Sequence, residues 1–98
     1  MNEMQKKSSE IIDIIDKKMK GAHDNDTTMI HLMEELGEIS RQIYNQKIGR
    51  DKLDKNNLAE EIADVSMLLN KLATLNGIDV ETAINNKINL LKTRHNLN

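Results

Sequence analysis

The sequence predicts an all-α protein, an antiparallel helix bundle of four helices in a single domain. Apolar residues recur every three or four positions along most of the chain, and no segment alternates with period two for long. There is no proline, and three of the four glycines separate the periodic segments. The connections between those segments are short, which favours antiparallel neighbours. A chain of 98 residues makes one domain, residues 1–98, and leaves no room for two.

The first two helices are expected at about residues 2–20 and 27–47. One side of the first helix carries Met4, Ile11, Ile12, Ile15 and Met19. Gly21 then opens a polar stretch that ends this helix. The second helix carries the apolar stripe Leu32, Leu36, Ile39 and Ile43. It ends before the polar segment around Gly49.

The last two helices are expected at about residues 56–76 and 79–95. The third helix carries the apolar stripe Leu58, Ile62, Val65, Leu69 and Leu72. Asn76 and Gly77 are typical of a helix C-terminus, and Asp79 is typical of the N-cap that starts the next helix. The fourth helix carries the stripe Val80, Ile84, Ile88 and Leu91.

The composition indicates a thin hydrophobic core. Apolar residues make up 38% of the chain, there is no Phe or Trp, and Tyr44 is the single aromatic residue. The core must therefore consist of Ile, Leu, Val, Met and Ala. A chain of this size buries only about 65% of its extended surface. We therefore expect a homo-oligomer to cover a further apolar face.

The charge pattern and the cysteine count exclude several classes of function. The net charge is −2 with 31% charged residues and no basic stripe, so nucleic-acid binding is not predicted. No run of about 18 apolar residues exists that would cross a membrane. The chain has no cysteine and hence no disulfide, and its N-terminus shows no signal-peptide pattern. The cytoplasm is the default location.

Two acidic clusters lie on the two middle helices, Glu34-Glu35-Leu36-Gly37-Glu38 and Glu60-Glu61-Ile62-Ala63-Asp64. Carboxylates three residues apart share a helix face, and here that face borders the apolar stripe. If the two helices pack antiparallel, four carboxylates converge on a common cleft: Glu35, Glu38, Glu61 and Asp64. Like charges beside a core repel each other, and a hard divalent cation bound between them would remove this repulsion. The four carboxylates therefore predict a cation-binding site. Either cluster alone is also typical of a solvated helix face.

The residue types narrow the choice of ion and of substrate. An all-oxygen ligand set favours Mg²⁺ or Mn²⁺. His31 lies in line with the acids of the second helix, where a histidine is more often a hydrogen-bond partner than a ligand. Lys87 and Arg94 share a face of the fourth helix and could hold phosphate oxygens. Basic residues near a helix C-terminus are also favoured by the helix macrodipole.

The two acidic motifs together resemble the EExxE and ExxD motifs of MazG-like nucleotide pyrophosphohydrolases. The similarity covers about residues 27–95 and extends to the Asn-Gly-Ile-Asp segment at 76–79 and to Lys87 and Arg94. The resemblance implies an all-α, Mg²⁺-dependent enzyme that hydrolyses nucleoside triphosphates to monophosphates and pyrophosphate. It also implies a homo-dimer or homo-tetramer with the site near a subunit interface.

By motif position, the resemblance implies the metal ligands Glu35, Glu38, Glu61 and Asp64. Glu34 and Glu38 are the catalytic candidates that would orient or deprotonate the attacking water. The candidate substrate-binding residues are Lys87, Arg94, His31 and Tyr44. The chain also departs from the family pattern, because Leu91 and His95 stand where relatives often have Asn and Tyr. Tyr44 is the sole candidate for stacking on a base.

Two other functions stay open at this point. A phosphoribosyl-ATP pyrophosphohydrolase belongs to a related all-α family with a similar acidic pattern, and turnover of phosphoribosyl-ATP alone would identify it. A non-catalytic helical oligomerisation module would use its acids only to solvate its surface. Such a module would gain little thermal stability from Mg²⁺ or Mn²⁺, whereas a true site gains stability by mass action.

Overall fold

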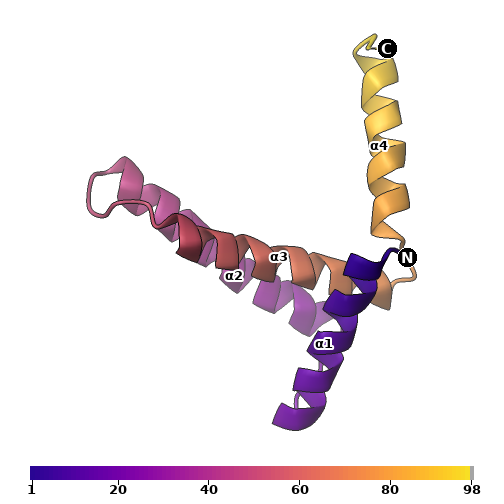
Figure 1. Ribbon diagram of the computed structural model, residues 1–98, viewed down its shortest axis with the longest axis horizontal. Coiled ribbons are helices and arrows are strands. Elements are labelled where there is room, and N and C mark those ends of the chain that lie inside the picture. Colours follow the sequence, from indigo (N-terminus) through magenta and orange to yellow (C-terminus); the bar gives the residue numbers. More distant parts are fainter. Residues whose placement is uncertain (98) are drawn as a thin grey trace.

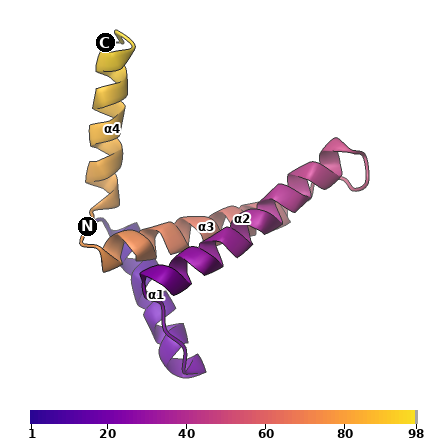
Figure 2. The same cartoon turned by 180° about the vertical axis from the view of Figure 1, so that it is seen from behind.

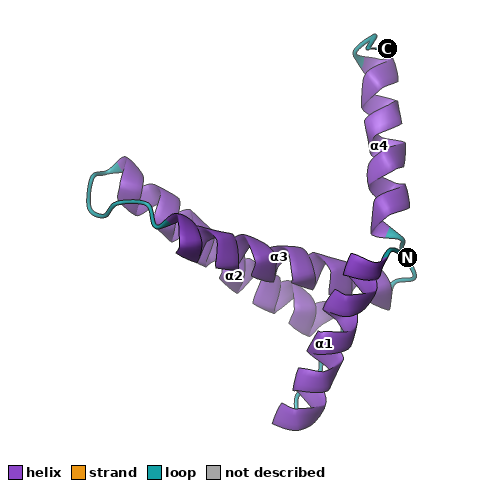
Figure 3. Cartoon of the chain, viewed as in Figure 1, coloured by secondary structure: helices purple, strands orange, loops and turns teal. Residues whose placement is uncertain are grey.

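The computed structural model describes residues 1–97 and consists of four helices joined by short connections (Figures 1 and 3). The helices are α1 (Glu3–Met19), α2 (Asn25–Lys47), α3 (Lys55–Leu75) and α4 (Val80–Arg94). No strand occurs among the described residues, which confirms the all-α prediction, and each helix begins and ends within two residues of its predicted bounds. None of the helices within residues 1–97 combines the length and apolar character that crossing a membrane requires.

Each helix begins at a side-chain cap. At α2, Asp24 accepts a hydrogen bond from the backbone N–H of Thr27, and the Thr27 hydroxyl accepts one from the backbone N–H of Asp24. Asp79 accepts from the backbone N–H of Thr82 and starts α4, as predicted. Gly77 follows the end of α3 with a φ of 66°, a left-handed conformation that glycine adopts without steric cost. These local signals explain why the helix boundaries were predictable.

Helices α2 and α3 form an antiparallel hairpin and lie side by side in both views (Figures 1 and 2). The side chains of Asn25, at the start of α2, and Asn76, at the end of α3, hydrogen-bond to each other. Helix α1 crosses the second half of α3, where Nζ of Lys71 contacts Asp13 at 2.5 Å and Ser9 at 3.3 Å. These contacts tie α1, α2 and α3 into one packed body.

The buried apolar core of this body is small. It consists of one residue from each of three helices: Ile12, Leu32 and Leu68, with 9%, 4% and 4% of their surface exposed. Many residues of the predicted apolar stripes are instead exposed, because no further helix within the described residues covers them: Met4, Ile11, Ile15, Met19, Leu36, Ile43, Ile62 and Leu69. The periodicity therefore located the helices correctly, but it overstated how many apolar side chains a single chain buries.

Helix α4 projects away from the other three helices (Figures 1 and 2). None of its residues is buried, and Ile84 and Ile88 are 54% and 44% exposed. Its base is held by the fully buried Gln5 of α1, whose Nε2 donates to the carbonyl of Ile78 and whose Oε1 accepts from the N–H of Val80. Among residues 1–97, therefore, no helix buries the apolar stripe of α4.

Candidate metal centre

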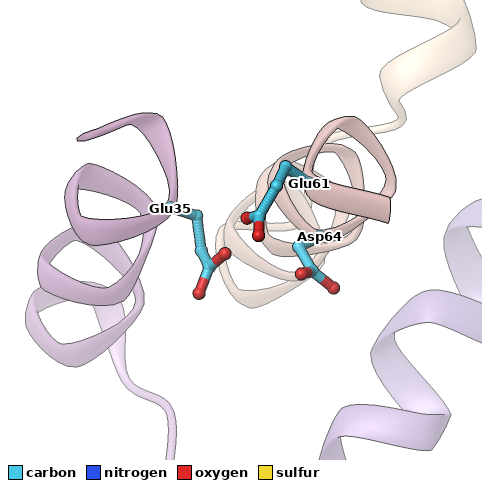
Figure 4. A group of neighbouring side chains, drawn as sticks. All are labelled: Glu35, Glu61 and Asp64. Carbon is cyan, nitrogen blue, oxygen red and sulfur yellow. The ribbon is translucent and has the colours of Figure 1, made fainter. Parts of the chain in front are cut away.

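Three carboxylates from α2 and α3 meet at one side of the helical hairpin (Figure 4). Glu35 comes from α2, and Glu61 and Asp64 come from neighbouring turns of α3. Each offers an oxygen atom, and these atoms all lie within 4.8 Å of one another. Figure 4 shows the carboxyl groups of Glu35 and Glu61 facing the same space between the two helices. Acids that are far apart in the sequence thus form one cluster, which we call the carboxylate centre.

The buried core explains why these carboxylates meet. Leu32 lies one turn before Glu35 on α2, and Leu68 lies one turn after Asp64 on α3. Both leucines belong to the core, so their packing sets the separation and the rotation of the two helices at this level. The acids that border the apolar stripes are then held against each other. Glu35 and Glu61 are half-buried, whereas Asp64 is exposed.

Hydrogen bonding, burial and neighbouring like charges raise the pKa values of two carboxyl groups of the centre. A hydrogen bond with Glu35 is the largest cause that raises the pKa of Glu61 from 4.5 to about 7. Burial and the charges of the neighbouring carboxylates add to this rise. Burial and then the charge of Glu35 also raise the pKa of Asp64. The centre therefore favours a bound proton or another positive charge.

The donor set of the centre fits a divalent cation. Oε2 of Glu61 is buried and has no hydrogen-bond partner, which is unusual for a buried polar atom. Carboxylate oxygens are the ligands that hard cations such as Mg²⁺ prefer. A bound cation would give this oxygen a partner and remove the repulsion among the three carboxylates. The residues that would hold it are Glu35, Glu61 and Asp64.

The other two acids of the first motif lie differently. Glu38 is half-buried, and its charge contributes to the raised pKa of Glu61. Its Oε1 lies 3.7 Å from Nη2 of Arg41, and it is not one of the three clustered residues. Glu34 is exposed and points about 100° away from Glu35 around the helix. The structure therefore places Glu38 beside the carboxylate centre and Glu34 outside it.

The predicted phosphate- and base-binding residues are not gathered at the carboxylate centre within one chain. Lys87 lines a separate hollow between the end of α3 and the start of α4. Arg94 is exposed in the last turn of α4, which projects away from the centre (Figure 1). Tyr44 is 59% exposed. It follows Glu35 by nine residues, which is about 13 Å along the axis of α2.

Histidines adjoin the carboxylate centre, and one of them was not singled out from the sequence. Nε2 of His31 lies 3.4 Å from Oε1 of Glu35, and Nδ1 of His31 lies 3.2 Å from Nε2 of His23. Nδ1 of His23 in turn contacts the carboxylate of Asp16 at 2.9 Å. These polar residues line one cavity of about 220 Å³ together with Asp64 and several apolar side chains. The residues that line it are Ile12, Ile15, Asp16, His23, His31, Glu35, Asp64, Met67 and Leu68.

No local pattern marks Asp16 or His23 in the sequence. Asp16 lies in the last turn of α1, and His23 lies in the polar connection to α2, which reads as an ordinary loop. They reach His31 only because the chain reverses between α1 and α2. The one signal that could have pointed to His23 was its place in a short loop directly before the helix that carries the first acidic motif, and nothing comparable pointed to Asp16.

A comparison with known protein families identifies the family of this chain. The family model of the MazG nucleotide pyrophosphohydrolase domain matches residues 23–97, which is more than half of the chain. The matched region contains the whole carboxylate centre and both predicted phosphate-binding residues, and it confirms the resemblance read from the two acidic motifs. No curated protein and no solved structure matches the chain. The chain belongs to the MazG nucleotide pyrophosphohydrolase family.

Proposed function

We propose that this protein hydrolyses nucleoside or deoxynucleoside triphosphates to monophosphates and pyrophosphate, with Mg²⁺ or Mn²⁺ at the carboxylate centre. Membership of a pyrophosphohydrolase family supports the reaction class. The observation that carries the proposal is the meeting of Glu35, Glu61 and Asp64 around a buried oxygen that has no partner. Acids that only solvate a helix face would point apart and would keep their ordinary pKa values.

The residues of the centre have distinct roles in this proposal. Glu35, Glu61 and Asp64 hold the cation through their carboxylate oxygens. When bound, such a cation neutralises phosphate charge and lowers the pKa of the water that attacks the α-phosphorus. Glu38 lies beside the centre, where its carboxylate can orient that water and accept its proton. Glu34 is exposed on another face of α2, so Glu38 is the stronger candidate for the general base.

Lys87 and Arg94 complete the proposed site from α4, and we propose that a second copy of the chain makes this possible. The apolar stripe of α4 and the exposed stripes of α1 to α3 would cover each other in a homo-dimer or homo-tetramer. Such an assembly would take Ile84 and Ile88 out of water. It would also bring two cationic side chains toward the acidic face of a neighbouring copy, where they would contact substrate phosphates.

The oligomeric state is tested by a charge placed on the apolar stripe. Ile88→Glu should dissociate the assembly, because a carboxylate would then have to be buried at the interface. Asn89→Glu adds the same charge at the adjacent exposed position and is the matched control. Sedimentation equilibrium should give a dimer or tetramer for the wild type and for Asn89→Glu, and a monomer for Ile88→Glu. A monomeric wild type would contradict the proposed assembly.

The reaction is tested by pyrophosphate release across a panel of ribo- and deoxyribonucleoside triphosphates with Mg²⁺, including phosphoribosyl-ATP. Glu61→Gln and Asp64→Asn should each lower kcat/KM by about 100-fold or more. Glu10→Gln removes an exposed carboxylate of α1 and should change little. Circular dichroism checks that the variants are folded. Full activity in both site variants would refute the assignment of the centre.

The same panel separates the other two functions. Turnover restricted to phosphoribosyl-ATP would identify the related pyrophosphohydrolase. If no nucleotide is hydrolysed and neither Mg²⁺ nor Mn²⁺ raises the melting temperature, the chain is a helical oligomerisation module instead.

A further inference from the structure

A line of four polar side chains runs from the end of α1 to the carboxylate centre. The carboxylate of Asp16 contacts Nδ1 of His23 at 2.9 and 3.0 Å. Nε2 of His23 contacts Nδ1 of His31 at 3.2 Å, and the two rings are stacked with their centroids 5.5 Å apart. Nε2 of His31 then lies 3.4 Å from Oε1 of Glu35. Every ring nitrogen of the two histidines therefore faces a specific neighbour.

The chemistry of these groups assigns the ring protons along the line. A carboxylate only accepts hydrogen bonds, so Nδ1 of His23 carries the proton toward Asp16. In the neutral ring, Nε2 of His23 is then an acceptor. It must be met by a donor, which places the ring proton of His31 on its Nδ1. In the neutral form of the His31 ring, Nε2 then keeps its lone pair, which faces the carboxylate of Glu35.

Two acceptors that face each other at 3.4 Å repel, and a cation bound by both atoms would remove that repulsion. Two ligand atoms that are each about 2.1 Å from one ion lie about 3.0–3.5 Å apart for angles between octahedral and tetrahedral values. The separation of the His31 nitrogen and the Glu35 oxygen falls within this range. His31, Glu35 and Asp64 also line the same cavity, and His31 lies next to the group of three residues whose oxygen atoms are within 4.8 Å of one another.

We propose that His31 is a nitrogen ligand of the ion at the carboxylate centre, and that Asp16 and His23 are positioning residues that turn its Nε2 toward Glu35. This inference rests on the proposed metal-dependent function. It adds a consequence for the choice of ion. An imidazole nitrogen binds Mn²⁺ and later transition metals better than Mg²⁺, which prefers oxygen, so the centre discriminates in favour of Mn²⁺. The pair of Asp16 and His23 acts as the outer hydrogen-bond support that metal-binding histidines usually have.

Pulsed electron paramagnetic resonance of the full chain loaded with Mn²⁺ tests the inference directly. The wild type should show coupling of the Mn²⁺ electron spin to a nitrogen nucleus, and His31→Gln should lose it. His95→Gln, which removes an exposed histidine at the end of α4, should keep the coupling. Mn²⁺ that binds without nitrogen coupling would overturn the inference while leaving the carboxylate centre intact. Failure to bind Mn²⁺ at all would overturn the proposed function as well.

The positioning role is tested by calorimetric titration with Mn²⁺ and with Mg²⁺. Asp16→Asn should raise the Kd for Mn²⁺ by about 10-fold or more, because it weakens the hydrogen bonds that orient His31. Loss of a hydrogen-bond partner of a metal-binding histidine typically has an effect of this size. Because His31 supplies nitrogen, this variant should weaken Mn²⁺ binding more than Mg²⁺ binding. Asp26→Asn, an exposed carboxylate at the start of α2, is the control and should change neither Kd. Equal weakening of both ions, in a variant that melts like the wild type, would count against the positioning role.

Discussion

The raised pKa of Glu61 leads to a quantitative prediction about proton release. Because the pKa of Glu61 is about 7, about nine-tenths of the chains hold this proton at about pH 6 and about one-tenth at about pH 8. A cation that binds the carboxylate oxygens must displace the proton. Binding should therefore release about 0.9 proton per chain at the lower pH and about 0.1 at the higher pH.

Isothermal titration calorimetry with Mn²⁺ in two buffers of different ionisation enthalpy measures the number of protons released. Glu61→Gln has no carboxyl group at this position, so its proton release should differ less between the two pH values than that of the wild type. Glu10→Gln keeps the whole centre and should behave like the wild type. Equal proton release by the wild type at both pH values would show that no proton is shared at Glu61, and the electrostatic reasoning for the centre would then be wrong.

Three further predictions concern stability. Without a cation, the free energy of unfolding should fall as the pH rises through about 7, because the folded chain keeps a proton on Glu61 that the unfolded chain loses above 4.5. Urea denaturation at several pH values measures this fall, and saturating Mg²⁺ should oppose it. Leu68→Ala should lower the free energy of unfolding by about 2–5 kcal/mol, because Leu68 is one of the three buried core residues. Leu90→Ala, on the exposed face of α4, should lower it far less in the same assay. Gln5→Leu leaves the carbonyl of Ile78 and the N–H of Val80 without their partner, which should lower the free energy of unfolding by about 1–3 kcal/mol for each group. A variant as stable as the wild type would show that water replaces the side-chain amide.

The helices were predictable because their signals are local. An apolar stripe, a capping aspartate such as Asp79 and a glycine such as Gly77 act within a few residues of where they stand. The two acidic motifs were visible for the same reason, since residues three apart on a helix share a face whatever the rest of the chain does. This local information was also enough to recognise the family.

The candidate site was predictable only in part. The sequence placed Glu35, Glu38, Glu61 and Asp64 in one cleft, and the structure gathers three of these carboxylates while Glu38 lies beside them toward Arg41. Which oxygens meet depends on side-chain rotamers and on the packing of the two helices. Periodicity determines neither of these properties.

By itself, the sequence determined that this protein is made of four helices, that two of them carry acids beside their apolar stripes, and that it belongs to the MazG family. Only the tertiary structure decided that Asp16 and His23 connect to His31 beside the carboxylate centre and that α4 stands apart with its stripe exposed. The physical reason is the range of the interactions. Helix formation depends on neighbours within about four residues, whereas the centre exists only because three buried side chains bring separate helices together.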